Sequence, residues 1–145
     1  MKPYPYNIYQ KAWLRDLKTT RAKQGVGYLH SNLGWCCLGR ACKILCIMQT
    51  NLKNYNNISD KPVDYNNKLP GVKVVYVYAY NGQTTVLPEL VIKKLKLLSS
   101  KGDGKKLIRF EDKFYQDLAE LSDQGISFKQ IANIVESDPW NFFYE

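Results

Sequence analysis

Hydrophobic residues recur at helical spacing in several segments of the chain. Apolar positions three or four residues apart have the period of a helix that buries one face. Asn7 precedes one segment as a helix cap, and Ser127 precedes another, with Gln130 completing a capping box. The segments that we expect to be helical are 7–19, 38–46, 88–98, 114–124 and 127–135.

A different pattern marks a β-hairpin in the middle of the chain. Residues 72–80 are rich in β-branched and aromatic side chains, and Asn81-Gly82 is the strongest two-residue hairpin turn. Residues 83–86 would form the returning strand, and 106–110 could add a short one. The sequence therefore predicts an α+β fold, with about four helices packed around a small antiparallel sheet that contains the 72–86 hairpin.

The length of 145 residues suits a single domain over 1–145. The polar segment 51–69 is expected to be a long loop. No apolar run approaches the ~20 residues that a membrane span requires, and MKPYPYNIYQ lacks the apolar stretch of a secretory signal. We therefore expect a soluble intracellular protein with free thiols and no membrane contact.

The net charge of +8 is unevenly distributed. Residues 1–50 and 51–110 each carry a balance of +7, whereas 111–145 carry −6. Such a basic body suits an anionic partner such as a nucleic acid, a nucleotide or an acidic protein. Solubility, with contacts between the acidic segment and the basic body, would explain the same pattern.

Four cysteines lie at 36, 37, 42 and 46, and His30 is the single histidine. Adjacent Cys36 and Cys37 do not form the spaced knuckles of a structural zinc site, so we expect no metal. A catalytic thiol at Cys36 or Cys37 would need His30 as its base. Burial as small hydrophobic side chains is the alternative that we prefer.

The stretch KQGVGYL offers a different kind of chemistry, because glycines let backbone amides approach an anion. Arg21 and Lys23 lie beside it, and Arg40 follows on the next predicted helix. These residues could form a phosphate pocket, or they could be a tight turn with solvated cations. The residues expected to line a ligand site are Arg21, Lys23 and Arg40 for phosphates, Gln24, Gly25 and Gly27 for polar contacts, and Trp13, Tyr28 and Trp35 for stacking.

DNA binding is not expected. The segment DQGISFKQIANIVES is similar to the first helix of a helix-turn-helix, but no basic recognition helix follows it. Its acidic surroundings would repel phosphates. Tyr76, Tyr78 and Tyr80 alternate on one face of the expected strand, where packing in a core or an interface is the simplest role.

The order of these motifs resembles a widespread set of small bacteriophage proteins, whose pattern is W, then QxxGxL, CCLGxxC, LP and GxSFxxIA. Arg40 departs from it, because an aliphatic residue is usual there, and so does Ser122, where Asn is common. The matching positions are Trp13, Leu17, Gln24, Gly27, Leu29, Cys36, Cys37, Leu38, Gly39, Cys42, Leu87, Pro88, Leu118, Asp123, Gly125, Ser127, Phe128, Ile131 and Ala132.

A looser resemblance is to viral sponge proteins that blunt CBASS-type antiphage defence. It implies an oligomer in the host cytoplasm that binds a cyclic di- or oligonucleotide signal without cleaving it, and that needs no cofactor. Two alternatives stay open at this point. One is a protein–protein inhibitor or accessory protein that uses the tyrosine face and the WNFFYE tail, and the other is a small enzyme that uses Cys36 or Cys37.

Overall fold

The computed structural model describes residues 3–55 and 76–145, and its elements form an α+β fold, as the sequence predicts. Within this part the helices are α1 (Ile8–Thr19), α2 (Cys37–Ile47), α3 (Glu89–Leu95), α4 (Leu118–Asp123), α5 (Phe128–Ser137) and the 3₁₀ helix η1 (Pro139–Asn141). The strands are β1 (His30–Ser31), β2 (Gly34–Trp35), β3 (Asn54–Tyr55), β4 (Val77–Tyr80), β5 (Asp103–Phe110) and β6 (Lys113–Asp117).

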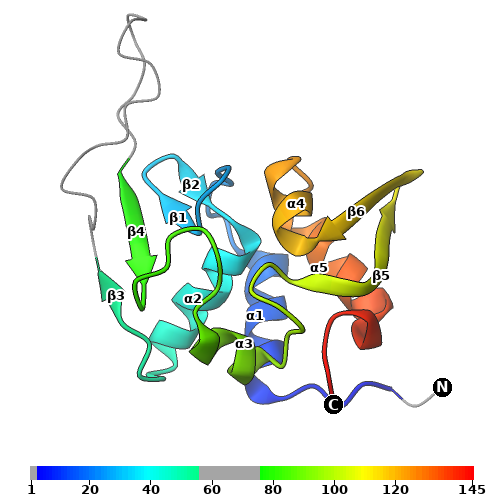
Figure 1. Ribbon diagram of the computed structural model, residues 1–145, viewed down its shortest axis with the longest axis horizontal. Helices are drawn as coiled ribbons and strands as arrows, with labels where there is room; N and C mark the ends of the chain where they lie inside the picture. Colours follow the sequence, from blue (N-terminus) through cyan, green and yellow to red (C-terminus); the bar gives the residue numbers. More distant parts are fainter. Residues whose placement is uncertain (1–2, 56–75) are drawn as a thin grey trace, which may run out of the picture.

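The strands form two separate antiparallel sheets. One has the order β2-β1-β4-β3, and the other is the two-stranded ribbon β5-β6. The two sheets lie on opposite sides of the helices in Figure 1. Among the described helices, none combines the length and the apolar character needed to cross a membrane.

Helix α1 begins and ends where the sequence predicts. Asn7 and Gln10 form a reciprocal capping box at its first turn. Gln10 is fully buried, and its side-chain amide donates hydrogen bonds to the Leu95 carbonyl (2.8 Å) and to the Tyr4 hydroxyl (3.1 Å). The start of α1 is therefore fixed to the end of α3 as well as capped.

The Asn81-Gly82 turn is confirmed. Both residues have positive φ (47° and 82°), as this two-residue turn requires. The backbone groups of Tyr80 and Gln83 exchange two hydrogen bonds of 2.9 Å across it. Residues 72–75 of the predicted first strand lie outside the described residues.

The predicted second strand over 83–86 is wrong. After one bridge at Gln83, the chain crosses toward β1, where the Thr84 carbonyl accepts from the Leu29 amide (2.7 Å). Strand β4 pairs with β1 and β3 instead. Strand β3 occupies the beginning of the expected loop 51–69, and residues 56–69 of that loop lie outside the described part.

The helix predicted over 114–124 is wrong in its first half. Phe114 belongs to β6 and is exposed, although its spacing to the following leucines matches a helix. Helix α4 begins only after Asp117, whose side chain accepts from the Glu120 amide (2.8 Å) as an N-cap. Pairing with β5 keeps the preceding residues extended.

The glycine of the CCLG sequence allows α2 to pack directly on the chain before β1. A Cβ atom on Gly39 would lie 1.7 Å from the Leu29 carbonyl oxygen. The same carbonyl accepts from the Cys36 amide (3.0 Å) just before α2 begins. A larger residue at this position would push the helix away from the strand.

The C-terminal WNFFYE segment is partly buried in the core, although Tyr144 keeps 40% of its surface exposed. Phe142 and Phe143 are 1% and 0% exposed. Phe143 and Leu97 form an isolated antiparallel β-bridge, and the Tyr144 amide donates to the Lys96 carbonyl (2.9 Å). These contacts hold the WNFFYE segment against the loop after α3.

Candidate functional site

Two backbone amides of the expected phosphate loop, those of Gly25 and Gly27, are occupied by the chain itself. The Gly25 amide donates to the Trp35 carbonyl (2.9 Å), and the Gly27 amide donates to the Asp123 carboxylate (3.0 Å). The Gln24 side-chain amide donates to the Ile126 carbonyl (2.7 Å). The expectation that these groups form an open anion cradle is therefore wrong. The Gly25 amide holds the loop to β2, and the other two groups hold it to the end of α4 and the turn that follows.

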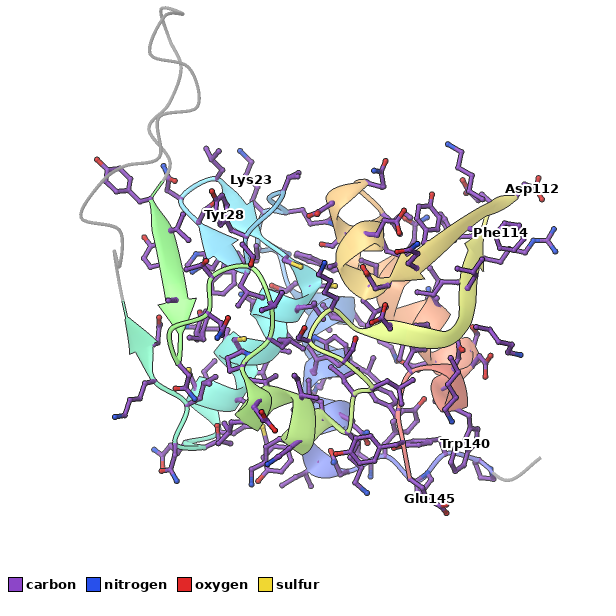
Figure 2. All side chains as sticks on the ribbon, in the orientation of Figure 1. Lys23, Tyr28, Asp112, Phe114, Trp140 and Glu145 are labelled. Carbon is purple, nitrogen blue, oxygen red and sulfur yellow. The ribbon has the colours of Figure 1, made fainter. Side chains whose placement is uncertain are left out.

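Close packing explains the glycine at position 25. A Cβ atom on Gly25 would lie 2.9 Å from the Gly34 carbonyl carbon, and one on Gly34 would lie 2.6 Å from the Gln24 backbone. Two chain segments cross there with backbone against backbone. Figure 2 shows Lys23 and Tyr28 on this loop beside β1 and β2. Arg21 and Lys23 are exposed, and Tyr28 is half-buried.

Trp13 does not face solvent. Its side chain is 0% exposed, and its indole N–H donates to the Cys37 carbonyl (2.9 Å). The expectation that Trp13 stacks on a ligand base is therefore wrong, because the ring joins α1 to α2 in the core.

Trp35 is already stacked within the protein. Its ring lies on His30 with a centroid separation of 3.4 Å, and His30 lies on Tyr78 at 4.2 Å. The guanidinium carbon of Arg40 lies 4.8 Å from the centroid of the Trp35 ring. A base that stacked on Trp35 would have to displace one of these partners.

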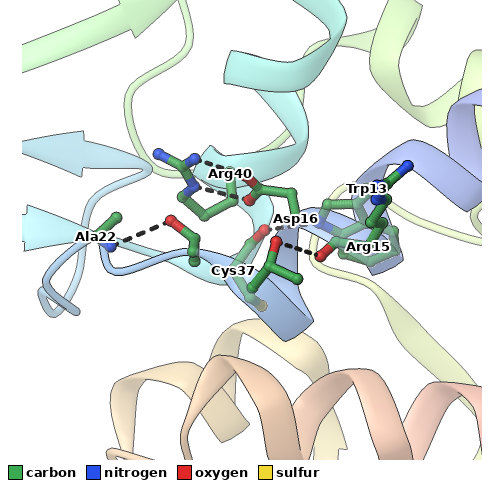
Figure 3. A network of polar contacts seen from close by, with 8 residues as sticks. Trp13, Arg15, Asp16, Ala22, Cys37 and Arg40 are labelled. Carbon is green, nitrogen blue, oxygen red and sulfur yellow. Dashed lines mark hydrogen bonds and ion pairs between the residues drawn. The ribbon is translucent and has the colours of Figure 1, made fainter.

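The charge of Arg40 is compensated inside the fold. Its Nε and Nη2 atoms donate to the two carboxylate oxygens of Asp16 at 2.9 and 2.7 Å (Figure 3). Both side chains are 12% exposed. This pair contradicts the expectation that the Arg40 charge is available for a phosphate, and it explains why a cation is tolerated where an aliphatic residue is usual.

His30 is held in its neutral form. Burial, together with the nearby charges of Lys43 and Arg40, lowers its pKa to about 4. Its Nδ1 atom is buried without a hydrogen-bond partner among the described residues. Trp35 and Tyr78 stack on the ring, so its position is set by packing.

The cysteines are packing residues for the most part. Burial raises the pKa of the Cys37 and Cys42 thiols well above the usual value. Cys37 also contacts α4, because its amide donates to the Ser122 hydroxyl (3.1 Å) and its thiol donates to the Leu118 carbonyl (3.5 Å). The unusual serine at 122 is thus a cap for the first turn of α2.

Cys36 differs from its neighbour in one respect. A hydrogen bond with Cys37 lowers the pKa of the Cys36 thiol, although burial opposes that effect. The residue is 5% exposed. In the described part of the chain, His, Cys, Asp and Glu side chains form no cluster of three or more that could hold a metal ion.

An open groove between α1 and α2 is the best candidate for a ligand site. It has a volume of about 490 Å³. Its cations are Lys11 and Arg15, which are exposed on α1 and four residues apart. The lining residues are Ile8, Lys11, Ala12, Arg15, Asp16, Thr19 and Ile44.

Lys11 and Arg15 also line a second, smaller hollow of about 230 Å³ on the α5 side of α1. There they lie near Tyr6 and near an ion pair between Lys18 and Glu136. Sequence reasoning missed both cations. Their spacing on a predicted helix was the available signal, because residues at i and i+4 share one face.

Comparison with known proteins yields one match. A family model described as a domain of unknown function (DUF8296) matches residues 6–139. No curated protein and no solved structure matches the chain.

Proposed function

The chain belongs to the DUF8296 family, which is described as a domain of unknown function. We therefore propose a function for this protein from its own residues. The protein binds a cyclic nucleotide signal of host antiphage defence in the α1–α2 groove and sequesters it without cleavage. The phage and immune-evasion part of this proposal comes from the resemblance described above. The ligand chemistry comes from the groove.

The combination of an apolar wall with two cations carries the proposal. Ile8, Ala12 and Ile44 provide apolar surface for a base. Lys11 and Arg15 provide charge-assisted hydrogen bonds for phosphate oxygens. A volume of about 490 Å³ lies within the ordinary range of small-molecule sites.

The electrostatics favour an anion at this place. Among the described residues, no carboxylate pairs with Lys11 or Arg15. Asp16 is the single acidic residue of the groove lining, and both its oxygens are engaged by Arg40. The net charge of +8 adds a long-range attraction for phosphates.

The positions of the reactive side chains support binding rather than cleavage. His30, the single imidazole, is stacked on Trp35 and Tyr78. Cys36 and Cys37 are buried beside α4, and none of these three residues lines the groove. A ligand in the groove would therefore meet cations and apolar side chains.

The test is capture and release of a panel of cyclic dinucleotides. We expect the protein to remove one of them from solution, and heat denaturation to return it unchanged by mass spectrometry. A charge-assisted hydrogen bond contributes about 1.5–3 kcal/mol, so Lys11→Glu with Arg15→Glu should weaken binding by about 100-fold or more. Lys129→Glu, an exposed charge reversal on α5, is the matched control and should bind as the parent does.

Three results would contradict the proposal. A hydrolysed product would indicate a nuclease. Unchanged affinity in the Lys11 and Arg15 double variant would remove the groove from consideration. A stoichiometric host protein in a pull-down, with no nucleotide captured from the panel, would favour a protein–protein inhibitor.

A further inference from the structure

A further hollow, which we call the aromatic hollow, lies where the chain before α1 meets the end of α5 and η1. It has a volume of about 290 Å³. The rings of Tyr4, Tyr6 and Trp140 line it, and Pro3 and Pro139 add apolar surface. Among the described residues, none lines both this hollow and the α1–α2 groove, so the two are separate sites.

The three rings of the aromatic hollow stand at steep angles to one another. The ring centroid of Tyr4 lies 4.8 Å from that of Trp140 and 5.1 Å from that of Tyr6, with interplanar angles of 74° and 61°. The Tyr4 hydroxyl donates to the Tyr144 carbonyl (2.7 Å), which holds this central ring in place. Rings arranged in this way form adjoining walls, and they can contact one ligand from different sides.

The aromatic hollow carries negative charge, although the chain as a whole carries +8. Glu136 and Asp138 line it, and no described Lys, Arg or His does so. Glu136 pairs with Lys18, which lies toward α1 and lines the smaller hollow there. Asp138 is exposed and forms no ion pair with the described residues. One carboxylate beside the three rings is therefore left without a compensating cation.

We propose that the aromatic hollow binds a small quaternary ammonium ion. The quadrupole of an aromatic ring attracts a cation placed over its face, and Asp138 supplies the opposite charge beside the rings. A primary ammonium is a poorer ligand because it is strongly hydrated, and walls of aromatic rings and prolines cannot replace its water. Methyl groups remove that cost and pack against the same walls. This site does not depend on the function proposed for the α1–α2 groove.

The carboxylates argue against a zwitterionic headgroup as the occupant. In phosphocholine a phosphate lies two carbons from the ammonium, so it would approach Glu136 and Asp138 and be repelled. A neutral apolar molecule would gain nothing from either carboxylate. The chemistry of the hollow therefore favours a free ion such as choline over a lipid headgroup.

The size of the hollow agrees with a small ligand. A volume of about 290 Å³ is at the lower end of the range of small-molecule sites. The hollow is open to solvent at Glu136 and Asp138, which are exposed. Cation–π contacts are weaker at exposed sites than at desolvated ones, so we expect binding in the range of about 0.1 to about 10 mM.

NMR titration of the full chain with choline, phosphocholine and 3,3-dimethylbutan-1-ol tests the proposal. The alcohol is the neutral carbon isostere of choline, so it has the same shape without the charge. We expect both the alcohol and phosphocholine to bind about tenfold more weakly than choline. Choline should shift the indole N–H signal of Trp140, identified by its loss in Trp140→Leu, and should leave the signal of the fully buried Trp13 in place.

Two variants separate charge from shape. Asp138→Asn keeps the size of an exposed side chain and should weaken choline binding about threefold without changing the affinity for the alcohol. Trp140→Leu keeps an apolar side chain and should weaken choline binding about tenfold, again with little effect on the alcohol. Asp112→Asn is the matched control and should bind choline as the parent does. Figure 2 shows Asp112 at the tip of the β5–β6 ribbon, well separated from Trp140.

Three results would overturn the proposal. One is the absence of a saturable shift with choline up to about 50 mM. Another is an alcohol that binds as tightly as choline, because the charge would then play no part. The third is phosphocholine that binds more tightly than choline, which would indicate a lipid headgroup as the occupant.

Discussion

Arg40 and Asp16 form a bidentate ion pair across the interface of α2 and α1, with both side chains mostly withdrawn from solvent. The pair connects two features of the molecule. Asp16 holds the Arg40 guanidinium over the Trp35 ring. Arg40 in turn neutralises Asp16, the one acidic side chain that lines the α1–α2 groove. The groove is therefore basic because of a contact inside the fold.

Breaking this pair from one side should be costly. Asp16→Ala leaves the Arg40 charge half-buried without its partner, and we expect the free energy of unfolding in urea to fall by about 2 kcal/mol. Replacing both residues, Asp16→Ala with Arg40→Leu, should recover most of that loss, because the double variant leaves no buried charge without a partner. Losses that simply add in the double variant would contradict this account.

The helices were the part of the fold that the sequence predicted best. Asn7 and Ser127 cap α1 and α5 as expected, because capping depends on residues three positions apart. The hairpin of β5 and β6 was missed for the opposite reason. Its turn uses Glu111 and Asp112 at positive φ (49° and 64°), where glycine or asparagine is the usual signal.

The candidate site was harder to predict because its contacts are distant in sequence. Gln24 and Gly27 looked available for a ligand, yet their partners Ile126 and Asp123 are 102 and 96 residues away. The anomaly at Arg40 was visible, but its partner Asp16 became known only from the packing of α1 on α2. The local sequence pattern indicates which groups have the chemistry to bind a ligand. The tertiary structure decides whether those groups already have hydrogen-bond partners within the fold.

Gly39→Ala should be among the most damaging substitutions. The added Cβ atom would meet the Leu29 carbonyl oxygen at 1.7 Å, and backbone cannot move aside cheaply. We expect a loss of at least about 3 kcal/mol of stability, or failure to fold.

Gly125→Ala is the matched control for that substitution. Gly125 has a φ of 82° but no atom within 4 Å of an added Cβ, so its cost is conformational alone, about 1 kcal/mol. Urea unfolding of both variants gives the comparison. Equal losses would show that close packing at Gly39 is unimportant.

Thiol labelling should distinguish the four cysteines. Cys46 is half-buried, whereas Cys36, Cys37 and Cys42 are buried. With a disulfide reagent we expect one rapid equivalent in the native protein and four after denaturation, because reaction requires an accessible thiolate. Cys46→Ser should remove the rapid phase. A second rapid thiol at Cys36 would revive the catalytic alternative.

The stability of the protein should fall in mild acid because of His30. The pKa of this group is lowered in the folded state from 6.5 to about 4, so the unfolded chain binds the proton more tightly. The contribution to stability is complete above about pH 6.5 and is lost as the pH falls toward 4. Full conversion of the shift would give about 3 kcal/mol, and partial exposure reduces this to about 1–2 kcal/mol.

His30→Phe is the variant that isolates this effect, because it keeps an aromatic ring between Trp35 and Tyr78 without a titrating group. Urea unfolding at pH 7, 5.5 and 4 should show the parent losing about 1–2 kcal/mol more than this variant. Parallel profiles for the two proteins would mean that another group governs the acid transition. A profile in which the parent gains stability on acidification would contradict the sign of the His30 shift.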